Sequence, residues 1–201
     1  MILFFALGPL QCSAQANSFL AECSGQATKK VNLYLGFTGS LSSPDQRWQF
    51  MSVGNESPER GAALHIRNVE SSKKWNVGWI ERSGTAYWSD DSRWLLLRDE
   101  FAADDTKLRA FNVAGDRPKE ISGLDGRIRR AIFAKIPTNE TTLWLYYPEV
   151  CFAPGESPTI IVTADAPLVP KRASGSGKPF TLKLTVNLDP LKVLALTNVS
   201  Q

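Results

Sequence analysis

Apolar and polar residues alternate along much of the chain, which is the pattern of β-strands that bury one face. From Val31 to Phe37 every second residue is apolar. Other apolar runs are separated by clusters of Gly, Ser, Asn and Pro, which are typical of turns. Long helices are not expected, because no run has helical periodicity and the chain contains 14 Gly and 12 Pro. The pattern predicts an all-β protein with strands at 31–37, 48–53, 63–69, 77–80, 94–98, 108–113, 131–136, 143–147, 159–164, 180–188 and 192–196.

A turn followed directly by an apolar strand occurs twice, 46 positions apart. One copy, Ser89–Glu100, reads SDDSRWLLLRDE, and the earlier copy begins at Ser43 and reads SPDQRWQFM. Asp and Ser side chains hydrogen-bond the nearby backbone and Pro44 presets a turn, so both copies predict a chain reversal before a strand. Trp48 and Trp94 are equivalent positions, and we expect both rings to pack in the core.

A turn and strand that recur at about 45 residues have the spacing of a four-stranded propeller blade. Residues Trp88–Trp94 resemble the corner of bacterial propeller repeats of the TolB and WD40-like kind, although Ser42 replaces the first Trp in the earlier copy. The resemblance covers Ser43 to Arg117 and implies propeller-like antiparallel blades. A β-sandwich is the alternative fold, because turns followed by Trp-containing strands also occur in sandwiches.

The expected organisation is one all-β domain, 17–201, with the repeats at about 31–158 and a C-terminal β-hairpin region at 159–201. The chain has room for about four blades, the smallest propeller ring, but only two copies are recognisable. We therefore expect an open array that does not close into a ring. Its free strand edges predict a protein partner or self-association.

Residues 1–16 have the pattern of an export signal. Met1–Ala16 contains no charged side chain, opens with the apolar run Ile2–Leu7 and ends in Ala-Gln-Ala, a small-x-small cleavage pattern. An ordinary N-terminal core strand is the alternative, and the run is too short to span a bilayer. The protein is therefore expected in the periplasm or the secreted fraction, with no membrane span.

Cleavage after Ala16 would leave two of the three cysteines, Cys23 and Cys151. An even number of cysteines in an oxidising compartment favours a disulfide. A bridge between these two residues would close a very long loop, for which chain-entropy models give several kcal/mol of stabilisation. Two buried free thiols are the alternative.

Charge and short motifs exclude several classes of function. The net charge is +3, and Lys and Arg occur in scattered pairs such as Lys29-Lys30, so a nucleic-acid partner is not expected. Gly175-Ser176-Gly177-Lys178 lacks the earlier glycine of a phosphate loop, and Pro179 prevents a helix from starting there. No cofactor is predicted.

No catalytic or metal site is predicted either. His65 is the only histidine, its ring is expected on the face opposite Leu64 and Ile66, and no Gly-x-Ser-x-Gly elbow accompanies it. A group of carboxylates offers oxygen ligands that calcium prefers, but its spacing fits no known loop, and turns explain it as well. These carboxylates are Asp90, Asp91, Asp99, Glu100, Asp104 and Asp105.

Aromatic residues leave one question open. Six tryptophans and four tyrosines could supply either a core or a carbohydrate-binding face, because large rings suit both. Trp75 and Trp79 lie outside the repeated turn, and the pattern does not decide between the two roles for them.

The sequence as a whole predicts an exported, non-catalytic module that binds a protein or a glycan. The alternative is a hydrolase whose site is built from loops. That alternative requires a polar pocket containing a carboxylate or a histidine of perturbed pKa.

Overall fold

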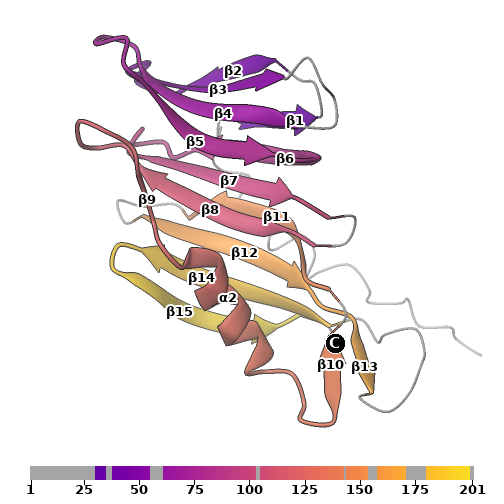
Figure 1. The fold of residues 1–201 in the computed structure, drawn as a ribbon. Helices are drawn as coiled ribbons and strands as arrows, with labels where there is room; N and C mark the ends of the chain where they lie inside the picture. Colours follow the sequence, from indigo (N-terminus) through magenta and orange to yellow (C-terminus); the bar gives the residue numbers. More distant parts are fainter. Residues whose placement is uncertain are drawn as a thin grey trace, which may run out of the picture.

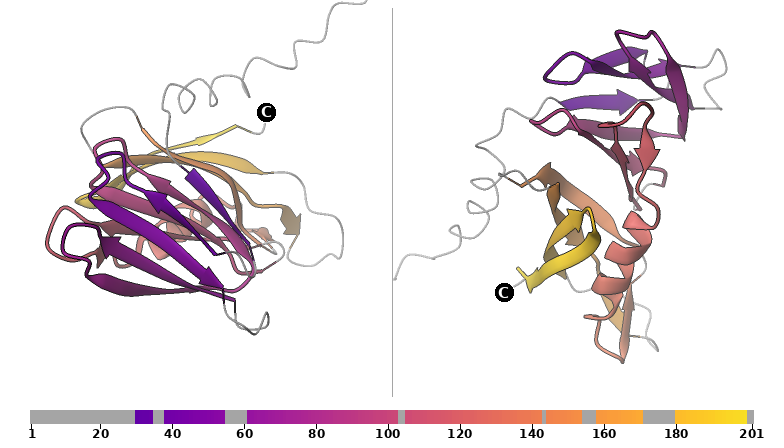
Figure 2. Two further views of the ribbon diagram at one scale, coloured as in Figure 1. Left: turned by 90° about the horizontal axis from the view of Figure 1, so that it is seen from above. Right: turned by 90° about the vertical axis from the view of Figure 1, so that its left-hand side faces the viewer.

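The computed structural model describes residues 30–34, 38–54, 61–102, 105–142, 144–153, 158–170 and 180–199. Antiparallel strands dominate this part of the chain, and its one helix is short. Three sheets of four or five strands lie one below the other, with the helix beside the lower two (Figures 1 and 2). The prediction of an all-β protein is therefore confirmed, apart from that helix.

The first sheet is a simple up-and-down meander. Each strand pairs with the next one along the chain, in the order β2-β3-β4-β5. Alternate side chains of β3 and β4 are buried, as the sequence pattern predicts. The strands are β2 (Gly39–Ser42), β3 (Trp48–Gly54), β4 (Ala62–Asn68) and β5 (Lys74–Ile80).

The second sheet repeats this meander and adds the first strand of the chain at its edge. Its order is β1-β6-β7-β8-β9. The strands β1 and β6 are therefore neighbours in space, although the whole first sheet lies between them in the sequence. Its strands are β1 (Lys30–Tyr34), β6 (Ser83–Trp88), β7 (Trp94–Glu100), β8 (Lys107–Asn112) and β9 (Lys119–Glu120).

The third sheet contains the C-terminal strands and has the order β11-β12-β14-β15. Because β12 pairs with β11 on one side and β14 on the other, the strands before and after residue 159 form one sheet. A two-stranded sheet, β10 (Glu140–Thr142) with β13 (Leu168–Pro170), lies beside it. The third sheet consists of β11 (Tyr146–Phe152), β12 (Thr159–Asp165), β14 (Thr181–Leu188) and β15 (Leu191–Asn198).

Two strand predictions before the third sheet are wrong. Residues 131–136 belong to the end of helix α2 (Leu124–Phe133) and the turn after it, because Leu124, Ile128 and Ile132 recur every fourth position and all three are buried. Of the strand expected at 143–147, only residues 146 and 147 lie in a strand, at the start of β11. β10 already ends at Thr142, and residue 143 lies outside the described part.

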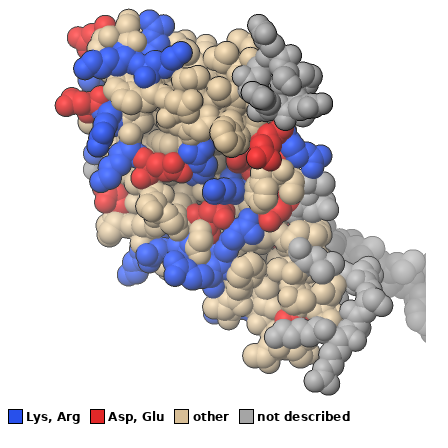
Figure 3. All heavy atoms as spheres, viewed as in Figure 1, with Lys and Arg blue, Asp and Glu red and all other residues tan. Residues whose placement is uncertain are grey.

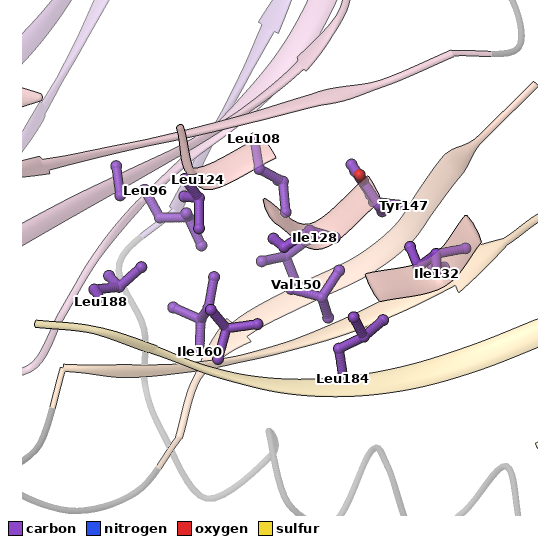
Figure 4. Packing of buried hydrophobic residues seen from close by; sticks show 14 of the residues in the cluster. Leu96, Leu108, Leu124, Ile128, Ile132, Tyr147, Val150, Ile160, Leu184 and Leu188 are labelled. Atoms are coloured by element: carbon purple, nitrogen blue, oxygen red, sulfur yellow. The ribbon is translucent and has the colours of Figure 1, made fainter. Parts of the chain in front are cut away.

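Two hydrophobic cores hold the stack together. The first core, between the first and second sheets, includes Trp48, Phe50 and Trp88. The second core lies between the second sheet, α2 and the third sheet, and Figure 4 shows Leu96 and Ile128 among its side chains. The second sheet therefore buries both faces.

The turn before β3 is held by the side chains of Ser43 and Asp45. The Ser43 hydroxyl donates to Asp45 Oδ1 at 2.6 Å and accepts the Trp48 N–H at 3.0 Å, and Asp45 Oδ1 also accepts the Arg47 N–H at 3.1 Å. Gln46 has a positive φ of 62°. Two polar side chains thus satisfy the backbone of a tight reversal.

The turn before β7 has the same bonds at the equivalent residues. The Ser89 hydroxyl donates to Asp91 Oδ1 at 2.6 Å and accepts the Trp94 N–H at 3.0 Å, and Asp91 Oδ1 accepts the Arg93 N–H at 3.0 Å. Ser92, equivalent to Gln46, has a φ of 60°. We name these two turns the first corner and the second corner.

Equivalent parts of the first and second sheets also contact each other. The Asp45 N–H of the first corner donates to Ser92 Oγ of the second at 2.9 Å. The indole N–H of Trp88 donates to the Leu41 carbonyl at 3.0 Å. Trp48 is 4% exposed in the first core and Trp94 is 2% exposed in the second, so each ring packs toward the following sheet.

Candidate functional site

A hollow of about 540 Å³ opens where the edges of the first and second sheets meet. Residues of the first sheet line it from β5 and the turn that follows, and residues of the second sheet line it from β7, β8 and β9. We name it the rim hollow. It is lined by Gly78, Trp79, Glu81, Asp99, Phe101, Lys107, Arg109 and Glu120.

Asp99 is the buried carboxylate of the rim hollow. On β7, Leu95 and Leu97 point into the first core, and Asp99, two residues further, lies on the same face. Asp99 is only 8% exposed, and its Oδ1 has no hydrogen-bond partner within the described residues. A buried carboxylate oxygen without a donor is rare, because burial removes its water.

The β6 residue that pairs with Asp99, Gly84, has no room for a side chain. Asp99 pairs with Gly84 on β6 and with Lys107 on β8. A Cβ atom on Gly84 would lie 2.4 Å from the Arg98 carbonyl oxygen and 2.6 Å from Ile80 Cδ1. The two sheets therefore approach closely beside Asp99, and only glycine fits there.

Burial raises the pKa of Asp99 to about 6. Arg109 and Lys107 lower this pKa, whereas Glu81 and Glu100 raise it, so desolvation outweighs the nearby cations. At neutral pH the group is still mainly ionised. The site thus holds a charged oxygen that the described residues do not fully satisfy.

Arg109 forms a fixed wall of the rim hollow. Its guanidinium donates to both carboxylate oxygens of Glu120, at 2.8 and 2.9 Å, and to the Val77 carbonyl at 2.6 Å, so it links the two sheets. It also lies 5.0 Å from the ring centroid of Phe111. Gly78, with a φ of 107°, allows the backbone to pass close to Arg109 Nη1.

Two aromatic residues at the rim hollow are exposed. Trp79 is 64% exposed and Phe101 is 39% exposed. Trp75 instead packs against the first core, with its ring centroid 5.8 Å from that of Trp48. Of the two tryptophans that the sequence left undecided, Trp75 has a packing role and Trp79 offers its ring to solvent.

The predicted acidic group does not converge on a metal site. Asp91 is used in the second corner, Glu100 pairs with Arg98 at 2.6 Å, and Asp105 pairs with Arg129 at 2.6 Å. Asp99 alone lines the rim hollow, and Asp104 lies outside the described residues. Within the described ranges no three His, Cys, Asp or Glu side chains form a candidate metal site.

His65 lies on the expected face, away from the first core. Its neighbours Leu64 and Ile66 are fully buried, whereas His65 is half-buried. Burial, and then the charge of Lys74, lower the pKa of His65. It is not among the residues that line the rim hollow.

The remaining sequence predictions fall largely outside the described residues. These include the export signal at 1–16, Cys23, and the loop at 175–178. Cys151 lies on β11, is 6% exposed, and its thiol is not free. Its pairing with Cys23 stays a prediction.

A second hollow, of about 300 Å³, lies where α2 meets β10. It is lined by threonines and apolar residues such as Phe133 and Ile136, with Glu140 as its one ionisable group. No buried polar atom lacking a partner lines it in the described part of the chain. It therefore offers less chemistry than the rim hollow.

Charges of both signs are interspersed over much of the face seen in Figure 3. As for membranes, none of the helical segments described here has the length and apolar character needed to cross one.

Sequence reasoning did not single out Asp99, Trp79 and Arg109 as one site. One signal was available: Asp99 stands 46 positions after Val53, an apolar residue of the earlier repeat. Compared with known proteins, the chain matches no protein-family model and no curated protein sequence. The chemistry of the rim hollow therefore rests on its own residues.

Proposed function

We propose that the protein is an exported, non-catalytic binding module whose ligand occupies the rim hollow. The observation that carries this proposal is the carboxylate of Asp99, which is 92% buried from solvent in that hollow with Oδ1 unpartnered among the described residues. A ligand that donates a hydrogen bond would satisfy this group. The export signal and a periplasmic or secreted location form part of the proposal.

The unfavourable burial of Asp99 supports a functional role. A buried, partly unsatisfied carboxylate destabilises a fold by about 1 to 3 kcal/mol or more. The equivalent position of the first sheet holds an apolar residue, Val53, instead of a carboxylate. Destabilising residues of this kind are characteristic of binding and active sites.

The proposed architecture is an open array of propeller-like blades. Its support is the equivalence of the first and second corners and the stacking of three meander-like sheets. In such an array, ligand groups meet residues from two adjacent blades, which is the arrangement of the rim hollow. A protein partner or self-association through the free edges stays a prediction, and sedimentation of the full chain would test it.

A hydrolase is the second candidate, favoured by the raised pKa of Asp99. Within the described residues, the lining of the rim hollow includes no Ser, Cys or His to serve as a nucleophile or base. Glu120 is engaged by Arg109, which leaves Glu81 as the second free carboxylate. Binding therefore accounts for the site with fewer requirements.

The test is backbone chemical-shift mapping of the full chain with a library of small polar compounds. Compounds that bind should shift the amides of Gly78, Phe101 and Lys107, and the Asp99→Val variant should lose these shifts. Shifts that gather around Phe133, or none at all, would overturn the proposal. Turnover of nitrophenyl esters, phosphates or glycosides by the wild type, lost in Asp99→Asn, would establish the hydrolase.

A further inference from the structure

We propose that the ligand of the rim hollow is a neutral carbohydrate, held between the exposed ring of Trp79 and the buried carboxylate of Asp99. This inference rests on the proposed binding function and names its ligand class. The observation behind it is that the same hollow is lined by one strongly exposed aromatic residue and one buried acceptor that lacks a hydrogen-bond donor among the described residues.

Trp79 supplies the apolar half of such a site. Its exposed fraction of 64% contrasts with Trp48, Trp88 and Trp94, which are 4% exposed or less. Phe101, 39% exposed, lines the same hollow. A sugar ring presents a face of C–H groups, and aromatic side chains bury such a face while leaving the hydroxyl groups free to hydrogen-bond.

Asp99 supplies the polar half. Its Oδ1 is shielded from water and has no donor among the described residues. Rotation about the Cβ–Cγ bond exchanges the two carboxylate oxygens, so either oxygen can meet a ligand. Sugar hydroxyl groups are good donors, and a hydrogen bond to a charged acceptor is among the stronger ones.

Lys107 offers a complementary donor across the sheet. It pairs with Asp99 in the register of β7 and β8, lines the hollow, and is exposed. No ion pair of Lys107 is formed within the described part of the chain. Its ammonium group can donate to a sugar oxygen while Asp99 accepts from a hydroxyl.

The charge balance of the hollow disfavours an anionic ligand. Three carboxylates and two cations line it, and Arg109 and Glu120 neutralise each other. With that pair set aside, Asp99 and Glu81 remain against Lys107, so an anionic ligand would meet an excess of negative charge. The volume of about 540 Å³ lies within the range of small-molecule sites.

The experiment applies the labelled full chain to an array of immobilised glycans. The array contains neutral oligomers of glucose, galactose, mannose and N-acetylglucosamine together with sialylated and sulfated glycans. Titration calorimetry then measures the affinity for the best glycan. We expect a neutral glycan to bind, with affinity at least tenfold weaker in Trp79→Ala and in Asp99→Val. Phe133→Ala removes another exposed ring, 45% exposed and outside the rim hollow, and should leave the affinity unchanged.

Each other result is decisive. Preference for sialylated or sulfated glycans, failure of every glycan to bind, or affinity unaffected by Trp79→Ala would overturn the carbohydrate inference. If small polar compounds still map to the rim hollow in that case, the binding function stands without it. Glycan binding with silent amides around the rim hollow would overturn both. Cleavage of a bound glycan, lost in Asp99→Asn, would support the ligand class and replace the binding module with an enzyme.

Discussion

The first and second sheets share a turn and a strand order but differ in the number of faces they bury. Residues at equivalent positions on the outward face of β3 and the corresponding face of β7 are Gln49 and Leu95, and then Met51 and Leu97. The leucines are fully buried in the first core, whereas Gln49 and Met51 are half-buried on a face that no described sheet covers. Whether one or both faces of a sheet are covered by another sheet therefore determines which positions of its strands are apolar. The corner does not determine this.

The next equivalent pair reverses this trend. Val53 is 39% exposed on the first sheet, and Asp99 is 8% exposed on the second. The apolar residue lies outside and the carboxylate lies inside, which stability alone would not favour. This reversal distinguishes a position used for binding from the positions used for packing.

The largest expected effect concerns the equivalence of the two core tryptophans. Trp48→Ala and Trp94→Ala should each lower the free energy of unfolding by about 3 to 5 kcal/mol, because each leaves a large cavity. Urea unfolding measures both. Trp79→Ala, which removes an exposed ring, should cost less than about 1 kcal/mol. If both core replacements left stability nearly unchanged, the two tryptophans would be equivalent in sequence but not as core residues.

Replacing Asp99 by the residue of the first repeat should stabilise the protein. Asp99→Val should raise the free energy of unfolding by up to about 3 kcal/mol at pH 7.5, because it removes a buried, under-bonded charge. Asp116→Val, at an exposed site, is the matched control and should change little. A less stable Asp99→Val protein would indicate that the carboxylate is a structural partner.

The same substitution has a defined pH dependence. The folded pKa of Asp99, about 6, exceeds the ordinary value of 3.8, so the folded state binds the proton more tightly than the unfolded chain. Stability from this group is therefore present at low pH and is lost as pH rises from about 4 through 6. The advantage of Asp99→Val over wild type should shrink below pH 6. An advantage that grew on acidification would contradict the raised pKa.

The two corner serines test whether the corners contribute equally. Ser43→Ala and Ser89→Ala should each lower the free energy of unfolding by roughly 1 to 3 kcal/mol. Each leaves a buried backbone N–H, that of Trp48 or Trp94, without its acceptor. Ser71→Ala, at an exposed turn, is the control. Unequal losses in a thermal or urea titration would show that the second corner, in which both Ser89 and Ser92 are buried, has a different role.

The smallest effect concerns the bond between the corners. Ser92→Ala should cost about 1 kcal/mol through loss of the bond from the Asp45 N–H. Gln46→Ala changes the equivalent positive-φ residue and so controls for the backbone conformation. If both variants lose the same stability, the bond between corners contributes nothing measurable.

The corners and the strands after them were predictable because their chemistry is local. Ser43, Asp45 and Trp48 specify a turn and a half-buried strand within six residues, without reference to the rest of the fold. Helix α2 was missed because it ends inside the run Ala131 to Ile136, which is apolar enough to resemble a strand. The spacing of four between Leu124, Ile128 and Ile132 indicates a helix only once these residues are known to pack in the second core.

The rim hollow was not predictable for a different reason. Asp99 and Glu100 are neighbours in sequence on opposite faces of β7. The stacked first sheet buries Asp99, whereas Glu100 shares a face with Arg98 and pairs with it. Trp79 reaches the hollow because β5 lies at the edge of the first sheet, beside the second. Such proximity depends on strand register and sheet stacking, which single-sequence patterns do not specify.

The pairing of β1 with β6 places the whole first sheet between two neighbouring strands of the second. Tyr34 and Ser83 face each other at the end of that pair, so the segment from 35 to 82, which contains the whole first sheet, begins and ends at adjacent points. A tight turn joining Tyr34 to Ser83 would leave a continuous hairpin. Gene rearrangement could therefore insert or excise this sheet without rethreading the rest. Removal of the first sheet, however, would expose Leu95 and Leu97, which it now buries in the first core.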